Sequence, residues 1–177
     1  MNINTPQQDK QLFSDICQII DTARIQVAVK ANTELTLMYW HIGRRINTDV
    51  LGNQRAEYGK QVVLTLSAQL QERFQTSQFS LRNLRRMMQF AEEFPNLEIV
   101  TPLVTHLSWT HFLIVLPIKD AIAREFYLNM AANSPWSKRE LEKQIDGMLF
   151  ERTVISGKSR YPSSPILYGT ATQTFAH

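Results

Sequence analysis

Three arginines at the start of a predicted helix are the residues of this sequence best suited to bind a ligand. Arg82, Arg85 and Arg86 lie within five residues. At about 100° per residue they fall on one side of the helix together with Gln89. Cations in the first turns oppose the helix macrodipole, so helix propensity alone does not explain them. Guanidinium groups bind phosphate oxygens in a planar fork, and we therefore predict a nucleic-acid-binding surface here.

The neighbouring charges extend this predicted surface. The segment from Arg55 to Arg86 has six basic and two acidic residues, whereas the whole chain has a net charge of only +3. On the other side of the arginine helix we expect a buried apolar stripe of Leu81, Leu84, Met88 and Ala91. The same charges would also suit an ordinary solvated helix face, and this alternative stays open. The predicted nucleic-acid-binding residues are Lys60, Arg73, Ser80, Arg82, Asn83, Arg85, Arg86 and Gln89.

The arginine helix and the helix before it resemble a helix–turn–helix pair. The first helix is expected at 60–74, and the second begins at Ser80 after the polar turn QTSQ. In DNA-binding proteins of this type the second helix enters the major groove. The turn is longer than the usual one and has no glycine, which departs from the motif.

No catalytic or metal-binding pattern accompanies the basic surface. His106 and His111 are five residues apart, so they would not share a helix face, and no cysteine lies near them. Metal-dependent nucleases need converging carboxylates with a lysine nearby, yet the chain contains no Glu-x-Lys or Asp-x-Lys. Glycine-rich phosphate loops and G-x-S-x-G are also absent. We therefore predict a chain that is not itself an enzyme, with no cofactor and no metal.

Composition favours a helical protein of the cytoplasm. The chain has 177 residues, of which 44% are hydrophobic and 20% charged, as in an ordinary globular domain. The single cysteine, Cys17, excludes an internal disulfide and fits a reduced compartment. The longest apolar run, 112–118, is too short to span a membrane, and the first residues do not form a signal peptide. We expect a soluble, cytoplasmic protein without a membrane partner.

Hydrophobic periodicity predicts one compact all-α domain of about seven helices. In the first helix, the apolar stripe expected to pack is Leu12, Ile16, Ile19, Ile20, Ala23 and Val27. Gly43, inside the second helix, predicts the close approach of another helix. Residues 53–59 and 96–104 are expected to be irregular connections. The expected helices are 10–31, 33–51, 60–74, 80–94, 109–116, 119–133 and 138–150.

Three serines predict helix starts. Ser80, Ser108 and Ser137 each follow an apolar residue and precede another at the fourth helical position. This arrangement is the hydrophobic staple, with the serine as N-cap.

The chain also divides by composition. We expect a disordered start at residues 1–9, a helical domain at residues 10–153, and a flexible tail or linker remnant at residues 154–177. Eleven of the last 24 residues are Ser, Thr, Gly or Pro, and no helical period continues there.

Six blocks of the sequence, in collinear order, carry a resemblance to a known family. The blocks are YWHIGRRI (39–46), YGKQVVLTLSAQLQERF (58–74), FSLRNLRRMMQF (79–90), LSWTHFLIVLPIKD (107–120), REFYLNMAANSPWSKRELEKQI (124–145) and LFER (149–152). Over about residues 10–153 they resemble the N-terminal domain of the bacterial YhcG family. The resemblance implies a helical domain that precedes a nuclease domain of the PD-(D/E)xK type, in DNA-acting proteins often linked with restriction or defence loci. The positions of the nuclease residues are absent here, so no catalytic residue is carried over.

We therefore predict a non-catalytic helical domain that binds nucleic acid, with DNA favoured, through the basic helix 80–94. The alternative is a protein–protein interaction or dimerisation module of a restriction or defence complex. The expected partners are accordingly DNA, a second copy of the chain, or proteins of such a system.

Overall fold

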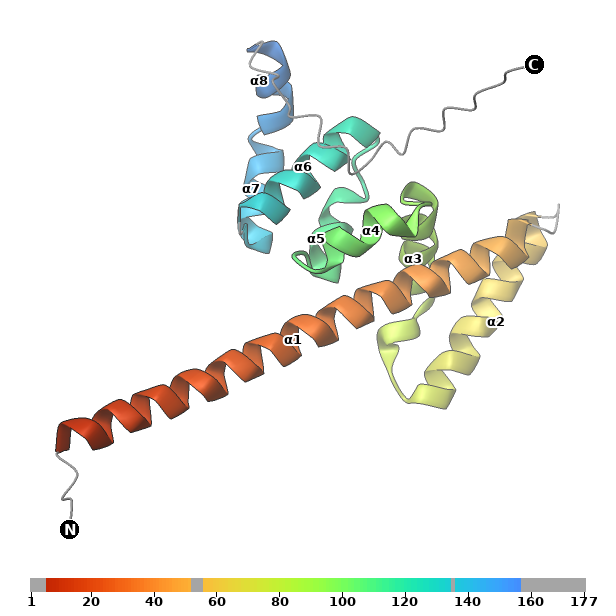
Figure 1. Ribbon diagram of the computed structural model, residues 1–177. Helices are drawn as coiled ribbons and strands as arrows, with labels where there is room; N and C mark the ends of the chain where they lie inside the picture. Colours follow the sequence, from red (N-terminus) through yellow and green to blue (C-terminus); the bar gives the residue numbers. More distant parts are fainter. Residues whose placement is uncertain (1–5, 52–55, 135, 157–177) are drawn as a thin grey trace, which may run out of the picture.

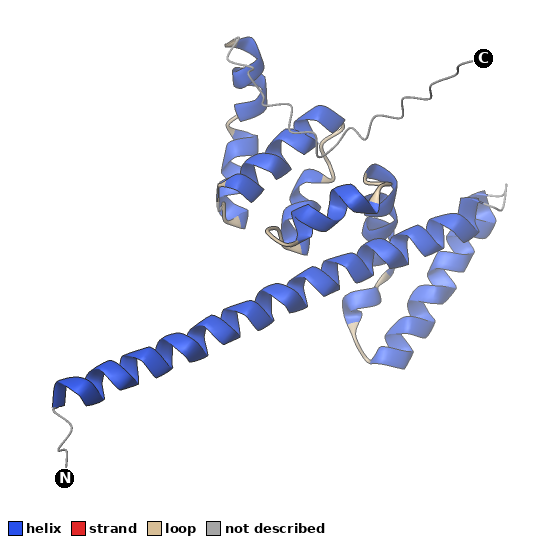
Figure 2. Ribbon diagram, in the orientation of Figure 1, coloured by secondary structure: helices blue, strands red, loops and turns tan. Residues whose placement is uncertain are grey.

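The computed structural model describes residues 6–51, 56–134 and 136–156, and every regular element in these residues is a helix (Figures 1 and 2). No strand occurs among them, which confirms the all-α prediction. The elements are α1 (Pro6–Leu51), α2 (Ala56–Phe74), the short 3₁₀ helix η1 (Ser77–Phe79), α3 (Leu81–Glu93), α4 (Leu97–Val104), α5 (Trp109–Val115), α6 (Ala121–Asn133), α7 (Lys138–Asp146) and α8 (Leu149–Ile155).

α1 is one helix of 46 residues where we predicted two. No glycine or proline lies between Pro6 and Gly43, so the backbone has no reason to break. Asn32 and Thr33, at the expected break, instead bind the rest of the molecule. The Asn32 amide donates to the Leu107 carbonyl (3.2 Å) and the Thr33 hydroxyl to the Val104 carbonyl (3.0 Å). α1 also includes residues 6–9, expected to be disordered, because proline suits the first helical position.

α4 replaces the irregular connection that we predicted at 96–104. Asn96 caps this helix, since its side-chain oxygen accepts from the Glu98 N–H (2.9 Å). Pro102 removes one intrahelical hydrogen bond near the end of the helix. Val100 and Val104 are fully buried on the same helix, and their burial offsets that loss. Tertiary packing therefore overrides the local signal of the proline.

The predicted helix 138–150 is divided into α7 and α8. Gly147 ends α7, and Met148 has φ 52° and ψ 45°, in the left-handed region that redirects the chain. The buried Tyr127 hydroxyl accepts from the Phe150 N–H (3.1 Å) at the start of α8. α8 then runs to Ile155, past the expected tail boundary at 153/154, and residues 157–177 lie outside the described residues.

The three serine-capped helix starts are confirmed. α3, α5 and α7 begin directly after Ser80, Ser108 and Ser137. Smaller differences occur elsewhere. α2 begins at Ala56 rather than at residue 60, and α6 begins at Ala121 rather than 119, because the Asp120 carboxylate caps it from outside.

The core consists of two hydrophobic clusters. One lies among α3 to α8 and includes Phe90, Phe112 and Tyr127, together with Trp40 of α1. The other joins α1, α2 and α3 through residues such as Tyr39 and Met87. Trp109 packs against both clusters. Its ring centroid lies 4.9 Å from that of Tyr39 and 5.3 Å from that of Phe90. Helix packing around α3 therefore holds the molecule together.

α1 and α3 cross at very short distance. A Cβ built on Gly43 would lie 1.8 Å from the carbonyl oxygen of Met87. The backbone of α3 thus occupies the space that any side chain at residue 43 would need, which confirms the predicted close approach. Next to this crossing, Asn47 donates to the Met88 carbonyl (2.9 Å) and the Trp40 indole to the Phe94 carbonyl (2.7 Å).

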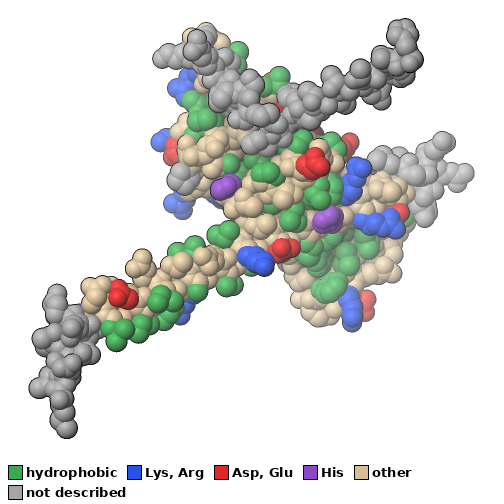
Figure 3. All heavy atoms as spheres, in the orientation of Figure 1, with side chains coloured by type: hydrophobic (Ala, Val, Ile, Leu, Met, Phe, Trp, Pro, Cys, Tyr) green, Lys and Arg blue, Asp and Glu red, His purple; other side chains and the backbone are tan. Residues whose placement is uncertain are grey.

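The N-terminal half of α1 projects away from the other helices (Figure 1). We call residues 10–31 the arm. Of these side chains only Cys17 is as much as half-buried, and the others are exposed. The apolar stripe that we expected to pack is therefore exposed. The other helices, α2 to α8, which we call the body, begin to contact this end of α1 only near Asn32. Figure 3 shows hydrophobic side chains along much of the arm.

A search of the helices within the described residues found none that combines the length and the apolar character needed to cross a membrane.

Candidate nucleic-acid interface

One side of α3, its inner side, is buried against the core. The opposite, outer side carries the arginines. The buried side chains are Leu84, Met87, Phe90 and Ala91. Leu81 and Met88, which we predicted to be buried, are only half-buried. The buried side of α3 therefore points in a slightly different direction from the predicted stripe, because α1 crosses α3 at Met87 rather than at Met88.

The three arginines lie together on the outer side of α3, as predicted. Arg82 and Arg85 are exposed and Arg86 is half-buried. In the described parts of the chain, no hydrogen bond or ion pair involves their guanidinium groups. Four residues of helix correspond to about 6 Å, so the three charges are concentrated in little more than one turn.

The polar residues predicted beside the arginines mostly serve the fold. The Asn83 amide donates to the Gln78 carbonyl (3.1 Å) and thereby fixes the turn before α3. Ser80 is the N-cap of α3, although its side chain makes no capping hydrogen bond. The Gln89 amide donates to the Leu116 carbonyl at the end of α5 (3.1 Å). Asn83 and Gln89 therefore position the arginines.

The two basic residues of α2 do not form one surface with each other. Both Lys60 and Arg73 are exposed. They are thirteen residues apart, which corresponds to about 20 Å along the helix and about 140° around it. Arg73 lies in the last turn of α2, which leads through η1 into the arginine-bearing end of α3, whereas Lys60 lies near the other end of α2.

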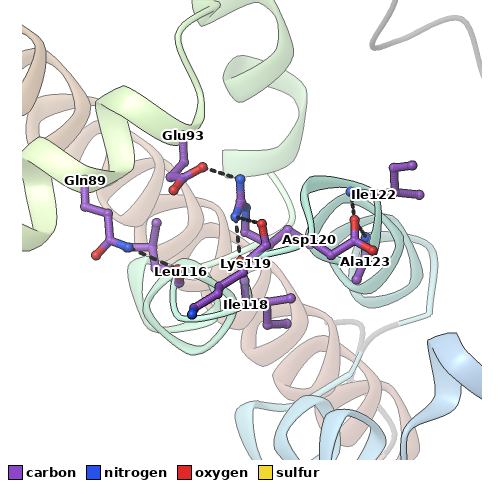
Figure 4. Close-up of polar contacts among 9 residues, drawn as sticks. Gln89, Glu93, Leu116, Ile118, Lys119, Asp120, Ile122 and Ala123 are labelled. Carbon is purple, nitrogen blue, oxygen red and sulfur yellow. Dashed lines mark hydrogen bonds and ion pairs between the residues drawn. The ribbon is translucent and has the colours of Figure 1, made fainter.

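The loop between α5 and α6 and the first turn of α6 contact the C-terminal half of α3 at Gln89 and Glu93 (Figure 4). Arg124 is buried and forms an ion pair with Glu93 at the end of α3. Its guanidinium group also donates to the Ile118 carbonyl (2.5 Å). The Glu93 carboxylate is therefore used by Arg124, and the charge at this end of α3 is balanced from within the fold.

Sequence reasoning missed one basic residue beside this surface. Lys119 is exposed in the same loop, three residues after the carbonyl that accepts from Gln89. It is thirty residues from Gln89 in the chain, so no helical spacing could have placed it beside α3. The contact between Gln89 and Leu116, together with the contacts of Arg124 with Glu93 and Ile118, shows that this loop lies against the helix.

A small cavity of about 170 Å³ lies behind the Glu93–Arg124 pair, between α3, α4 and α6. Apolar side chains such as Phe94, Leu103 and Leu128 line it, together with Glu125. Desolvation by burial raises the pKa of the Glu125 carboxyl above its usual range. Glu93 also lines the cavity, but its carboxylate is paired with Arg124.

Of the two histidines considered for catalysis, one links two segments of the fold and the other is exposed. The His111 Nε2 lies 3.1 Å from the Trp136 carbonyl, and its Nδ1 lies 2.8 Å from the Ser108 hydroxyl, so the ring joins the start of α5 to the segment before α7. His106 is exposed in the turn between α4 and α5. Within the described residues, no three His, Cys, Asp or Glu side chains gather closely enough to hold a metal ion.

Comparison with known proteins agrees with the resemblance drawn from the sequence. Residues 15–152 match the family model described as the DUF1016 N-terminal domain. The chain is also 30% identical, over 177 residues, to a protein of Escherichia coli (strain K12) named "Putative nuclease YhcG". The match covers 83% of this chain and 47% of that relative, so the chain spans about half the length of the curated relative. No solved structure matches the chain significantly.

The family match covers most of the helical body together with most of the arm. It therefore includes α3 and its arginines, and the chain belongs to the DUF1016 N-terminal domain family.

Proposed function

We propose that this chain is a DNA-binding domain of a nuclease-associated protein and that it docks through the N-terminal half of α3. The observation that carries the proposal is the set of three arginines on the outer side of α3, which have no hydrogen-bond or ion-pair partner among the described residues, while the inner side of the helix is buried. The E. coli relative is named "Putative nuclease YhcG", which supports a role for this chain beside an enzyme that acts on nucleic acid.

The fixed position of α3 favours binding. Because α1 and α3 are in backbone contact at Gly43, the helix cannot shift without disturbing the core. Arginine side chains on a rigid helix lose less freedom on binding than those on a mobile segment. B-DNA carries one negative charge per about 1.7 Å of its axis, so three guanidinium groups within about 6 Å can each reach a phosphate.

Salt dependence provides the first test. We expect Kd values in the micromolar range or below for a fluorescently labelled duplex, measured by anisotropy. With about three phosphate contacts, affinity falls by about 40-fold between 50 and 200 mM salt. The combined substitution Arg82→Ala, Arg85→Ala and Arg86→Ala should nearly abolish binding and remove most of the salt slope. Single-stranded and branched DNA in the same titration would show which form is preferred.

A matched control separates the position of the charges from their number. Lys138, Arg139 and Lys143 on α7 are all exposed, and the two lysines form only 4.0 Å ion pairs. Replacing these three residues by Ala removes the same charge at little cost in stability. We expect DNA affinity to fall much less than in the α3 variant. Equal affinities of the α3 variant and the wild type, with helicity unchanged, would rule out the proposal.

A second function is supported by a different observation. The exposed apolar side chains of the arm are typical of a surface that binds another protein. An interaction or dimerisation module is therefore the alternative function, and it is compatible with DNA binding because the arm and α3 do not share residues.

A further inference from the structure

The arm has an apolar surface that nothing in the described structure covers. Its large side chains are 43% to 71% exposed, far more than core residues. We call the seam the seven apolar residues between positions 12 and 27 that lie within about 60° of Ile16 around the helix. They are Leu12, Phe13, Ile16, Ile19, Ile20, Ala23 and Val27.

The seam faces away from the side of α1 that the body uses. Thr36 is fully buried against the body, and at about 100° per residue it points about 160° away from Ile16. Ile25 and Val29, by contrast, lie within about 20° of the direction of Thr36. No rearrangement of the body along its present side of α1 would therefore cover the seam.

After Lys10, the charges of the arm are arranged symmetrically along it. Between residues 11 and 33 the charged residues are Asp15, Asp21, Arg24 and Lys30. The two acids precede the two bases, and the order is symmetric about a point between residues 22 and 23. A parallel copy would therefore place like charges together, whereas an antiparallel copy places each acid at the height of a base.

We infer that the arms of two copies of this chain pair side by side and antiparallel, crossing close to residue 22. Ile16 then lies opposite Val27 of the second copy, and Ile20 lies opposite Ala23. Asp15, about 100° around the helix from Ile16, and Lys30, about 40° from it in the same direction, fall on matching flanks of the seam, so Asp15 lies close to Lys30 of the second copy.

The area of the seam is sufficient for a stable dimer. A large side chain can bury about 150–250 Å² of surface. With the lower of these values, the exposed fractions of the seam side chains correspond to about 600 Å² per copy. Two copies would thus bury about 1,200 Å², the lower end of the range for specific, stable interfaces. The repeating three- and four-residue spacing is also that of a two-stranded coiled coil.

The bodies do not obstruct this pairing. The body begins to contact α1 at Asn32. In the antiparallel arrangement the two Asn32 residues are about 30 Å apart along the helices, at opposite ends of the paired segment. Each body also lies on the side of its own helix that faces away from the seam.

The first test measures mass by light scattering on the full chain without nucleic acid, so it does not depend on DNA binding. We expect about 41 kDa, twice the 20.5 kDa of the chain. The variant Ile16→Glu with Ile20→Glu should be a monomer, because it places charges in the seam. The matched control, Ile25→Glu with Val29→Glu, changes the other side of the same arm and should remain a dimer.

A charge exchange tests the orientation. Asp15→Lys should weaken the dimer at least tenfold, and adding Lys30→Asp should restore it. A spin label on Cys17, the single cysteine, should report a distance of about 20 Å between copies, whereas a parallel pair would give about 10 Å. A monomeric wild type, a dimer that survives both seam charges, or a label distance near 10 Å would each overturn the inference.

Discussion

At the residue scale, buried polar atoms in this fold have partners. Among the described residues, no buried side-chain nitrogen or oxygen lacks a hydrogen bond. Arg124, Gln89 and Tyr127 each join two helices or a helix and a loop through backbone groups. These contacts matter because the helices are short, and each helix end leaves N–H or C=O groups that need partners.

Tyr127→Phe should test one of these contacts. The hydroxyl accepts from the Phe150 N–H, a donor in the first turn of α8 that has no partner within the helix. Desolvation by burial raises the pKa of the Tyr127 hydroxyl above its usual range. We expect the free energy of unfolding to fall by about 1 kcal/mol in urea denaturation. An unchanged midpoint and slope would show that α8 does not need this hydrogen bond.

At the element scale, the crossing of α1 and α3 decides where the arginines lie. α1 is long enough to contact the body and to project beyond it, and α3 crosses it where a glycine allows backbone contact. The inner side of α3 is thereby fixed, and the basic side faces outward.

Gly43→Ala should be strongly destabilising. Its Cβ would meet the Met87 carbonyl at 1.8 Å, and because this neighbour is backbone, the two helices would have to separate. We expect a loss of about 3 kcal/mol or more in the free energy of unfolding, although alanine is the better helix former. The control is Gly59→Ala, whose Cβ would meet only a methyl group of Val50. It should cost far less, and similar losses for both would contradict this account of the crossing.

At the scale of the whole molecule, the chain combines a packed body with a solitary helical arm. A helix without tertiary contacts is only marginally stable in water. If two arms pair, they support each other, and they would also hold two α3 surfaces on one assembly. Binding of DNA by two linked surfaces would then be stronger than binding by one.

Hydrogen exchange should reveal this coupling. Backbone amides of residues 10–31 are expected to be protected at protein concentrations where the dimer forms. They should exchange much faster on dilution or in the Ile16→Glu, Ile20→Glu variant. Amides of α3 report on the body and should keep the same protection in every case. Arm protection that does not change with concentration would indicate that the arm is stable without a second copy.

The sequence by itself determined the helical class, the three serine-capped helix starts and the outward side of the arginines. These features depend on periodicity and on groups within one turn, which are local. The family also followed from the sequence, through blocks that the later comparison confirmed. DNA binding by the eight predicted residues stays a prediction.

Only the tertiary structure decided the rest. The unbroken α1, the helical state of α4 and the division between α7 and α8 depend on contacts such as Asn32 to Leu107 and Tyr127 to Phe150, which join distant segments. An amphipathic period shows that a helix has an apolar side but not what covers it. The stripe from Leu12 to Val27 therefore looked like core, whereas the fold leaves it exposed as the arm.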